Sequence, residues 1–490
     1  MIEWFAQPNR KICIFGSKAR ACYCKRILEY RFSLKIHCFL DNDKQRQGQK
    51  FDGLIVLSPQ MLREIKDSAV VFVAVQVCFQ KEILTQLKKM GITRIIKYGY
   101  PNDLAFLKEF LPYKDCNFLP PKTAKTALEA KSAKLIAIYL PQFHTIPEND
   151  KWWGKGFTEW TNVKSIIDKH QIQSQPIPGE LGYYNLADVS VMRKQTELAK
   201  QYGIFGFCFY HYYLGNGKRL LEKPIENYLK SDINFPFCLC WANHDWGMHW
   251  GADPDSDKKI FVKQTYEDYE KHFSLLVKFF KDSRYIKIDG KPVFIIWVAE
   301  VIPNILQVTK QLRKLAAEAG LPGLYLLKAD WLKDNKTPRS LGFDASMETP
   351  PSWHLYNATE MIDVFFEKHR VFEYNEYNKL MSQRKINYKR YPAVFPQWNN
   401  TPRYKESSWL MLNSSPEKYR QWLSHAIEQV KNFKQDERLV FINAWNEWGE
   451  GVVLEPDVRN GRAYLEATLA ALHPKIRKLD LEMLKLLGLI

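Results

Sequence analysis

The chain has 490 residues, of which 46% are hydrophobic and 14% aromatic, and its formal net charge is +17. This length predicts about two or three domains, and the basic balance favours anionic neighbours: nucleic acid, an anionic membrane leaflet or acidic glycans. Nucleic acid is the least favoured, because the sequence has no zinc-finger spacing, no RNP-type motif and no arginine-rich tract. A basic solvated surface without a specific partner explains the charge equally well.

Cysteine usage and hydropathy predict the compartment. The nine cysteines have no paired spacing, so we expect them to stay reduced and to bind no metal. We find no secretory signal, and no apolar run reaches the roughly 20 residues that cross a bilayer. These features predict a cytoplasmic protein that is soluble or peripherally attached to the inner face of a membrane.

Residues 1–100 alternate strand and helix patterns, which predicts a small Rossmann-like parallel α/β domain. Strands are expected at 11–15, 35–40, 70–75 and 94–98, with helices at 19–30 and before Lys89. The first turn begins Gly16-Ser17 but lacks the later glycines of a dinucleotide-binding loop, whereas Asp41 stands where a ribose-binding acid would. A nucleotide-sugar donor site and a purely structural domain both remain open, and no other cofactor is expected.

Residues 101–134 contain Pro120-Pro121 and a polar stretch, and we expect them to form a linker. From 135 to 473, buried-looking strands alternate with amphipathic helices. The strands are expected at 135–140, 203–210, 235–241, 292–298, 323–328, 343–347, 393–397 and 439–444, and the helices at 189–202, 266–281, 302–319 and 416–433. About eight parallel strands with helical crossovers predict a (β/α)8 TIM-like barrel with insertions.

Barrels of this kind carry their chemistry at the carboxyl ends of the strands. In this sequence, polar and aromatic residues follow each predicted strand. A single one of them is more often a core residue than a ligand, but their recurrence at the same place favours a sugar-binding pocket. The candidates for that pocket are His144, Glu159, Trp160, His211, Asn243, Asp245 and Trp398.

The segment from Leu439 to Asp457, LVFINAWNEWGEGVVLEPD, carries the strongest chemical signal. Glu447 and Glu450 are spaced so that both carboxylates lie on one side of a helical turn. Burial and mutual repulsion separate the pKa values of such a pair, so one carboxyl can donate a proton while the other accepts one. Trp445 offers a flat face to a sugar ring, and Asn446 offers an amide to its hydroxyls. The alternative, a solvated helix face, fits poorly beside a buried strand.

Five ordered motifs fall between Lys134 and Leu472. They are YLPQFHTIPENDKWWGKGFTEWTNV at 139–163, GFCFYHYY with GNGKRLLEKP at 206–224, FPFCLCWAN at 235–243, FPQWNNTPR at 395–403, and NAWNEWGEG with LEPD at 443–457. Together they resemble the WbsX-type proteins, glycosyltransferases of O-antigen and capsule clusters that carry a domain related to glycoside hydrolase family 99.

The resemblance implies roles for the two glutamates. Glu447 matches the residue that deprotonates the sugar 2-hydroxyl to form a 1,2-anhydro intermediate, and Glu450 matches the general acid and then base of a retaining reaction. Two departures leave the substrate open: His244 and Asp245 stand where the pattern usually has Glu and Asn, and Gly449 replaces the commoner Ala.

We therefore expect an enzyme that makes or remodels glycosidic bonds in surface-polysaccharide biosynthesis, such as lipopolysaccharide O-antigen or capsule, acting on an oligosaccharide or lipid-linked glycan. An endo-α-mannosidase-like glycoside hydrolase and a non-catalytic glycan-binding protein are the alternatives. A metal-dependent hydrolase is disfavoured, because no further ligands stand at recognisable spacing. Transfer and hydrolysis use the same pair of carboxylates, so the sequence does not separate them.

Residues 474–490 place apolar side chains at helical spacing together with four basic residues, which predicts an amphipathic C-terminal helix. Such a helix either docks on protein or lies on an anionic membrane surface. The breadth of its apolar stripe favours docking or an oligomer contact.

Overall fold

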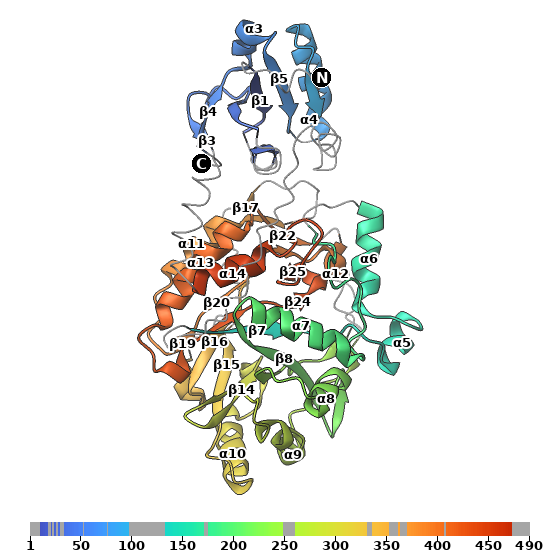
Figure 1. The fold of residues 1–490 in the computed structure, drawn as a ribbon, viewed down its shortest axis with the longest axis vertical. Coiled ribbons are helices and arrows are strands. Elements are labelled where there is room, and N and C mark those ends of the chain that lie inside the picture. Colours follow the sequence, from blue (N-terminus) through green and yellow to red (C-terminus); the bar gives the residue numbers. More distant parts are fainter. Residues whose placement is uncertain are drawn as a thin grey trace. The chain divides into compact units, whose positions relative to one another are not determined.

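The computed structural model describes residues 10–17, 21, 24–25, 28–29, 34–51, 53–75, 77–97, 133–170, 175–247, 260–330, 336–351, 361–362, 370–405 and 408–472. The chain divides into two compact units (Figure 1). One comprises Met1–Asn117, Gln171–Ser174 and Met361–Val371, and the other Phe118–His170, Gln175–Glu360 and Phe372–Ile490. The expected linker lies outside the described residues except for 133 and 134, and the expected C-terminal helix lies wholly outside them.

The N-terminal unit is built on one mainly parallel sheet. Its strands are β1 (Lys11–Phe15), β2 (Ile36–Leu40), β3 (Lys50–Phe51), β4 (Leu54–Leu57), β5 (Ala69–Val73) and β6 (Ile95–Lys97). Their order is β3-β4-β2-β1-β5-β6, and only the β3–β4 pair is antiparallel. Because β1 is central and the chain builds outward on both sides, the Rossmann-like prediction is confirmed. The helices described in full are α3 (Leu62–Ile65) and α4 (Val77–Lys89), whereas most of the helix expected at 19–30 lies outside the described residues.

The turn after β1 stands where a Rossmann domain would bind the phosphates of a nucleotide. Gly16 has a φ of +119°, and a Cβ there would lie 2.9 Å from the carbonyl oxygen of Ala74, so only glycine fits. Ser17 Oγ donates to Asp41, and Arg46 Nη1 lies 3.7 Å from the same carboxylate. Asp41, the candidate ribose ligand, is thus already paired within its own unit.

The larger unit is a closed parallel barrel. Its strands are β7 (Lys134–Tyr139), β8 (Ile204–Gly215), β10 (Phe237–Trp241), β14 (Lys291–Ile296), β15 (Tyr325–Asp330), β16 (Ala345–Glu348), β19 (Arg390–Tyr391), β20 (Ala393–Val394) and β23 (Leu439–Ile442). The sheet runs in the order β19-β16-β15-β14-β10-β8-β7-β23-β20. β19 and β20 are halves of one strand interrupted by Pro392, which has no N–H to continue the ladder. The path therefore begins and ends on the same strand, and the predicted (β/α)8 barrel is confirmed.

Helices stand between most of these strands. The four predicted helices are present as α7 (Val189–Gln201), α9 (Tyr269–Phe280), α10 (Ile305–Glu318) and α13 (Pro416–Val430). Three further helices, α8 (Lys223–Lys230), α11 (Tyr374–Gln383) and α14 (Ala463–Leu472), were not predicted. α9 and α10 begin three residues later than expected, because Asp268 and Asn304 precede them in the left-handed conformation with φ of 66° and 52°. α13 begins where expected, with the side chain of Ser415 accepting a hydrogen bond from the Lys418 amide.

Insertions decorate the barrel beyond this alternation. They include the helices α5 (Pro147–Trp153), α6 (Glu159–His170) and α12 (Thr401–Tyr404), and the short strands β9 (Lys218–Leu220), β11 (Trp246–Gly247), β12 (Ile260–Val262), β13 (Lys287–Ile288), β18 (Arg370–Glu373), β21 (Trp398–Asn399), β22 (Trp409–Leu412), β24 (Asn446–Glu447) and β25 (Val452–Val453). The short strand β17 (Met361–Ile362) belongs to the other unit. Among the described residues, no helix is long and apolar enough to cross a membrane.

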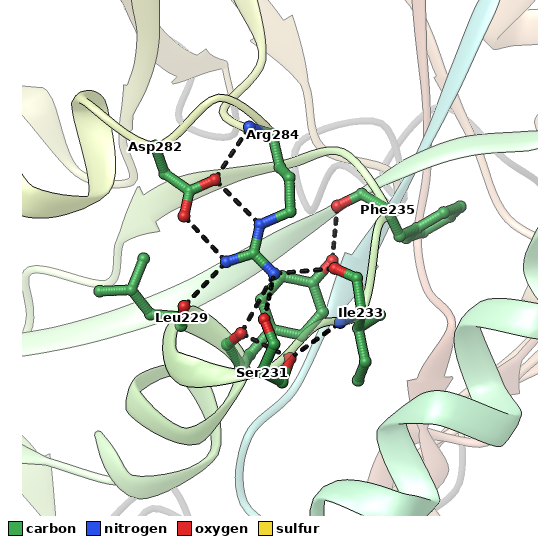
Figure 2. A network of polar contacts seen from close by, with 7 residues as sticks. Leu229, Ser231, Ile233, Phe235, Asp282 and Arg284 are labelled. Carbon is green, nitrogen blue, oxygen red and sulfur yellow. Dashed lines mark hydrogen bonds and ion pairs between the residues drawn. The ribbon is translucent and has the colours of Figure 1, made fainter.

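Arg284 fastens the end of α8 to the turn that precedes β13 (Figure 2). Its guanidinium pairs with Asp282 at 2.8 Å and donates, over 2.7–3.3 Å, to the backbone carbonyls of Tyr228, Leu229, Ser231 and Ile233. Carbonyls at a helix C-terminus have no partner within the helix, so a forked donor satisfies several at once. This contact fixes the loop that leads into β10.

Candidate active site

One arginine joins three glutamates in the barrel unit. Arg403, in α12, donates from Nε to Glu159 Oε1 at 2.5 Å and from Nη2 to Glu447 Oε1 at 2.7 Å, and its Nη1 lies 2.8 Å from Glu450 Oε1. Glu159 begins α6 after β7, Glu447 lies in β24, and Glu450 ends the 3-10 turn Trp448–Glu450 after β23. Three segments that are far apart in the sequence therefore meet at one guanidinium, which we call the Arg403 cluster.

The Arg403 cluster is short of positive charge. Fully ionised, one guanidinium and three carboxylates would carry a net charge of −2, and these side chains are mostly buried. Burial raises the pKa of Glu447 well above its usual value; Arg403 lowers that pKa, and Glu159 and Glu450 raise it further. Burial also raises the pKa of Glu450, against the effect of Arg403. The pair is therefore arranged to retain a proton that can be donated.

A glycine makes room for this arrangement. A Cβ on Gly449 would lie 2.0 Å from Glu159 Oε1 and 2.9 Å from Arg403 Nε. These separations are far inside van der Waals contact, so a side chain at this position would force Glu159 or Arg403 to move. Gly449, which replaces the commoner Ala, is thus the residue that leaves room for the Glu159 side chain.

Glu455 organises the base of the site, and sequence reasoning missed it. Its Oε1 accepts from Gln195 at 2.6 Å and Trp445 at 2.9 Å, and its Oε2 accepts from Trp448 at 2.7 Å and Tyr184 at 2.8 Å. Burial raises its pKa to about 7. Trp445 has no exposed surface, so the prediction that it offers a face to a sugar ring is wrong. The sequence feature that could have identified Glu455 is an acidic residue directly after the apolar run VVL.

Two asparagines expected to bind sugar instead tie the ends of the barrel strands together. Asn446 donates to the Leu140 carbonyl at 3.0 Å and accepts from the Leu140 amide at 2.8 Å. Asn243 does the same with Val298, at 2.7 and 2.8 Å. Both amide side chains are completely buried. Their polar atoms are committed to the backbone, so the prediction of sugar contacts is corrected.

His211 faces away from the Arg403 cluster. Its Nε2 lies 3.0 Å from Nε2 of His272 on α9, and burial lowers its pKa to about 3. Side chains alternate along a strand, so its neighbour Tyr212 points to the opposite face. Tyr212 accepts a hydrogen bond from Gln142 at 2.9 Å, and charges on Glu447 influence its pKa, which burial raises. On this strand, Tyr212 and not His211 therefore faces the Arg403 cluster.

The remaining candidates are buried or half-buried. The ring centroids of Trp160 and Phe143 lie 4.2 Å apart, and the Trp160 indole donates to the Tyr184 carbonyl at 2.7 Å, so Trp160 is a packing residue at the start of α6. Asp245 is half-buried and accepts from the Gln264 amide at 2.7 Å. His144 and Trp398 are buried, and burial lowers the pKa of His144 to about 4.

Several buried polar atoms make no hydrogen bond within the described part of the chain. They include Gln142 Oε1, Glu159 Oε2 and Trp398 Nε1. Native structures rarely leave such groups without a partner. Glu159 belongs to the Arg403 cluster and Gln142 to its surroundings, and the hydroxyls of a sugar would supply the missing donors.

Comparison with known proteins finds relatives of both units. Residues 135–468 match the family model described as Glycosyltransferase WbsX, and residues 8–96 match a model described as C2185-like, N-terminal. Uncharacterized protein WxcX from Xanthomonas campestris pv. campestris strain B100 is 38% identical over 356 residues, which are 71% of this chain and 51% of the relative. WxcX of strain ATCC 33913 is 37% identical over 352 residues, 70% and 50% respectively. The chain thus spans about half the length of these curated relatives.

Among solved structures, the GH99 endo-alpha-mannosidase from Bacteroides thetaiotaomicron aligns with a TM-score of 0.45 at 16% identity, covering 72% of this chain and 99% of that one. A glycoside hydrolase-like protein aligns with the same TM-score at 13% identity, covering 72% and 98%. The resemblance inferred from the five motifs is confirmed by the family match.

Proposed function

Because the chain belongs to the glycosyltransferase WbsX family, we propose that it makes or remodels glycosidic bonds of a surface polysaccharide such as O-antigen or capsule. The observation that carries the proposal is the Arg403 cluster, in which Glu447 and Glu450 share one guanidinium with Glu159. Buried carboxyls with raised pKa values are the groups that acid–base chemistry at a glycosidic bond requires.

The two glutamates divide the proton transfers between them. In the first step, Glu450 gives its proton to the leaving oxygen while Glu447 takes the proton of the sugar 2-hydroxyl, whose oxygen attacks C1 to form the 1,2-anhydro intermediate. In the second step, Glu450 takes a proton from the incoming hydroxyl, which attacks C1, and Glu447 returns its proton to O2. Both carboxyls end as they began, and the anomeric configuration is retained.

Arg403 suits this exchange because it touches both members of the pair. Proton transfer moves negative charge between Glu447 and Glu450, and a guanidinium with separate N–H groups on each carboxylate stabilises either distribution without moving. Glu159 is a positioning residue in this proposal, because it accepts a hydrogen bond from Arg403 Nε and so fixes the plane of the guanidinium.

The incoming hydroxyl separates transfer from hydrolysis. A sugar hydroxyl gives a new glycosidic bond, and water gives the endo-α-mannosidase-like outcome considered above. We propose transfer to an oligosaccharide or lipid-linked acceptor on the cytoplasmic side of the membrane, with a nucleotide sugar as the candidate donor.

The function is tested with the purified full chain. Candidate nucleotide sugars and oligosaccharide or lipid-linked acceptors are incubated with the protein, and products are identified by mass spectrometry. Glu450→Gln keeps the shape of the side chain but removes its titrating proton, so it should lose most turnover and keep binding. Glu180→Gln is the matched control, because Glu180 is an exposed carboxylate paired with Arg462. Equal turnover in the two variants would reject the catalytic assignment.

A further inference from the structure

An aromatic shelf stands on the insertion that carries Glu159. The shelf comprises Trp152, Trp153 and Phe157 from the segment after β7, and Phe261 from β12. The Trp152 and Phe261 rings stack with centroids 4.4 Å apart and planes 9° apart, and Trp153 and Phe157 stack at 5.1 Å and 16°. Trp152 is 42% exposed, although large aromatic side chains are usually buried.

The shelf is continuous with the Arg403 cluster. Phe261 packs against a hydrophobic cluster that contains Tyr212 and Trp246, whose rings lie 5.2 Å apart. Tyr212 is the member of this hydrophobic cluster that lies nearest the carboxylates: its hydroxyl accepts from Gln142, and the charges of Glu447, Arg403 and Glu159 all act on it. Phe261 therefore joins the exposed indole of Trp152 to the hydrophobic cluster that contains Tyr212.

The chemistry of the shelf suits carbohydrate. An exposed indole offers a flat apolar surface that matches the C–H face of a pyranose, and stacking on Phe261 holds the ring still, so little side-chain entropy is lost on binding. The ammonium of Lys151 lies 5.3 Å from the centre of the Trp152 ring. A cation there can donate to sugar hydroxyls or to an acidic substituent.

We propose that the shelf is a distal sugar-binding subsite, which holds pyranose rings of the acceptor glycan whose attacking hydroxyl lies at Glu447 and Glu450. This inference rests on the proposed function and deepens it: the acceptor is a glycan several residues long, recognised away from its attacking hydroxyl. Binding energy gained at the shelf then positions the reacting sugar.

The test measures how affinity depends on chain length, in the inactive Glu450→Gln background so that the ligands stay intact. The probes are di-, tetra- and octasaccharides prepared by partial acid hydrolysis of lipopolysaccharide O-chains and capsular polysaccharides, titrated by calorimetry. Trp152→Ala should cost about tenfold more affinity for octasaccharides than for disaccharides. Trp152→Phe, which keeps a ring, should restore most of the difference. Leu306→Ala is the control, because Leu306 is 41% exposed on α10.

Three results would overturn the proposal: an equal loss at every chain length, no loss, or no dependence on chain length before Trp152 is replaced. Turnover is measured separately in the wild-type background. If Glu450→Gln keeps full turnover while Trp152→Ala still shows the length-dependent loss, the proposed function fails and the shelf stands. If Glu450→Gln is inactive but Trp152→Ala shows no length dependence, the shelf fails and the proposed function stands.

Discussion

Glu159 Oε1 occupies the space that a side chain on residue 449 would need: a Cβ on Gly449 would lie 2.0 Å from that oxygen. Carbon and oxygen atoms without a bond between them stay about 3.5 Å apart. The glycine and the glutamate are therefore a matched pair, and the missing side chain at 449 admits the third carboxylate to Arg403.

Gly449→Ala should expel Glu159 from Arg403. Because Glu159 raises the pKa values of Glu447 and Glu450, its removal should lower them. A general acid with a lower pKa loses its proton at lower pH, so the alkaline limb of the kcat/KM profile should move to lower pH. We also expect turnover to fall about 10- to 100-fold and stability to fall by about 1–3 kcal/mol, the usual cost of overpacking.

Glu159→Asp tests whether the steric conflict is the cause. Aspartate is one methylene shorter, so Glu159→Asp in the Gly449→Ala background should relieve the contact and recover part of the lost stability. In the Gly449 background, the same change should only weaken the pairing with Arg403. A double variant that is no more stable than Gly449→Ala would show that Gly449 serves some other purpose.

Arg403→Lys should disable the site, because an ammonium is a point charge that cannot hold three carboxylates in fixed directions. Glutamates left without a partner in a buried site cost about 3–5 kcal/mol, so we expect a large loss of both stability and turnover. Arg420→Lys is the control: Arg420 pairs with Glu417 on the exposed side of α13, where such pairs contribute about 0–1 kcal/mol. Similar losses in both variants would contradict a special role for Arg403.

How much of this site the sequence could predict depends on the range of the contacts. Glu447 and Glu450 follow a buried strand at a spacing that already indicates paired chemistry, so local pattern was sufficient. Arg403 stood in a recognised motif, but its role depends on Glu159, which is 244 residues away. His211 shows what the sequence does not predict within a strand. Neighbouring side chains point to opposite faces of the sheet, and only the folded structure shows which of them point towards the site.

The fold was predicted more fully than the side-chain contacts. Strand and helix patterns repeat along the chain, and each pattern depends only on residues close together in the sequence. The number and order of the predicted strands were therefore enough to predict a barrel. Asn446 and Trp445 were assigned to sugar because their residue types suit sugar, but the same groups also suit a buried backbone or a buried carboxylate. Residue type alone does not choose between these partners, since the choice depends on which atoms the fold leaves unpaired nearby.

Glu455 makes the stability of the barrel unit depend on pH. Its pKa of about 7 in the folded protein exceeds the ordinary glutamate value of 4.5. Between these values the unfolded chain has released the proton that the folded protein keeps, so stability should fall as pH rises, by about 3 kcal/mol in total. Glu455→Gln removes this titration but also replaces one acceptor oxygen with an amide group that donates. The variant should therefore be much less stable than wild type at pH 4.5, and the difference should shrink towards pH 7.5.

Urea unfolding across that pH range measures the effect. Glu180→Gln again serves as the control, because its exposed carboxylate should leave the slope of stability against pH unchanged. Parallel curves for wild type and Glu455→Gln would show that Glu455 does not titrate in this window.

Arg284→Lys should lower stability without lowering the activity of the folded protein. A lysine can reach one or two of the four carbonyls that Arg284 satisfies, and each buried acceptor left without a donor costs about 1–3 kcal/mol. We expect a loss of about 2–4 kcal/mol in urea unfolding. Arg313→Lys is the matched control, since Arg313 bonds one carbonyl and Asp344 at a more exposed position. If both variants lose the same stability, the fastening of α8 by Arg284 has been overestimated; if Arg284→Lys lowers turnover per folded molecule, the loop after α8 also shapes the site.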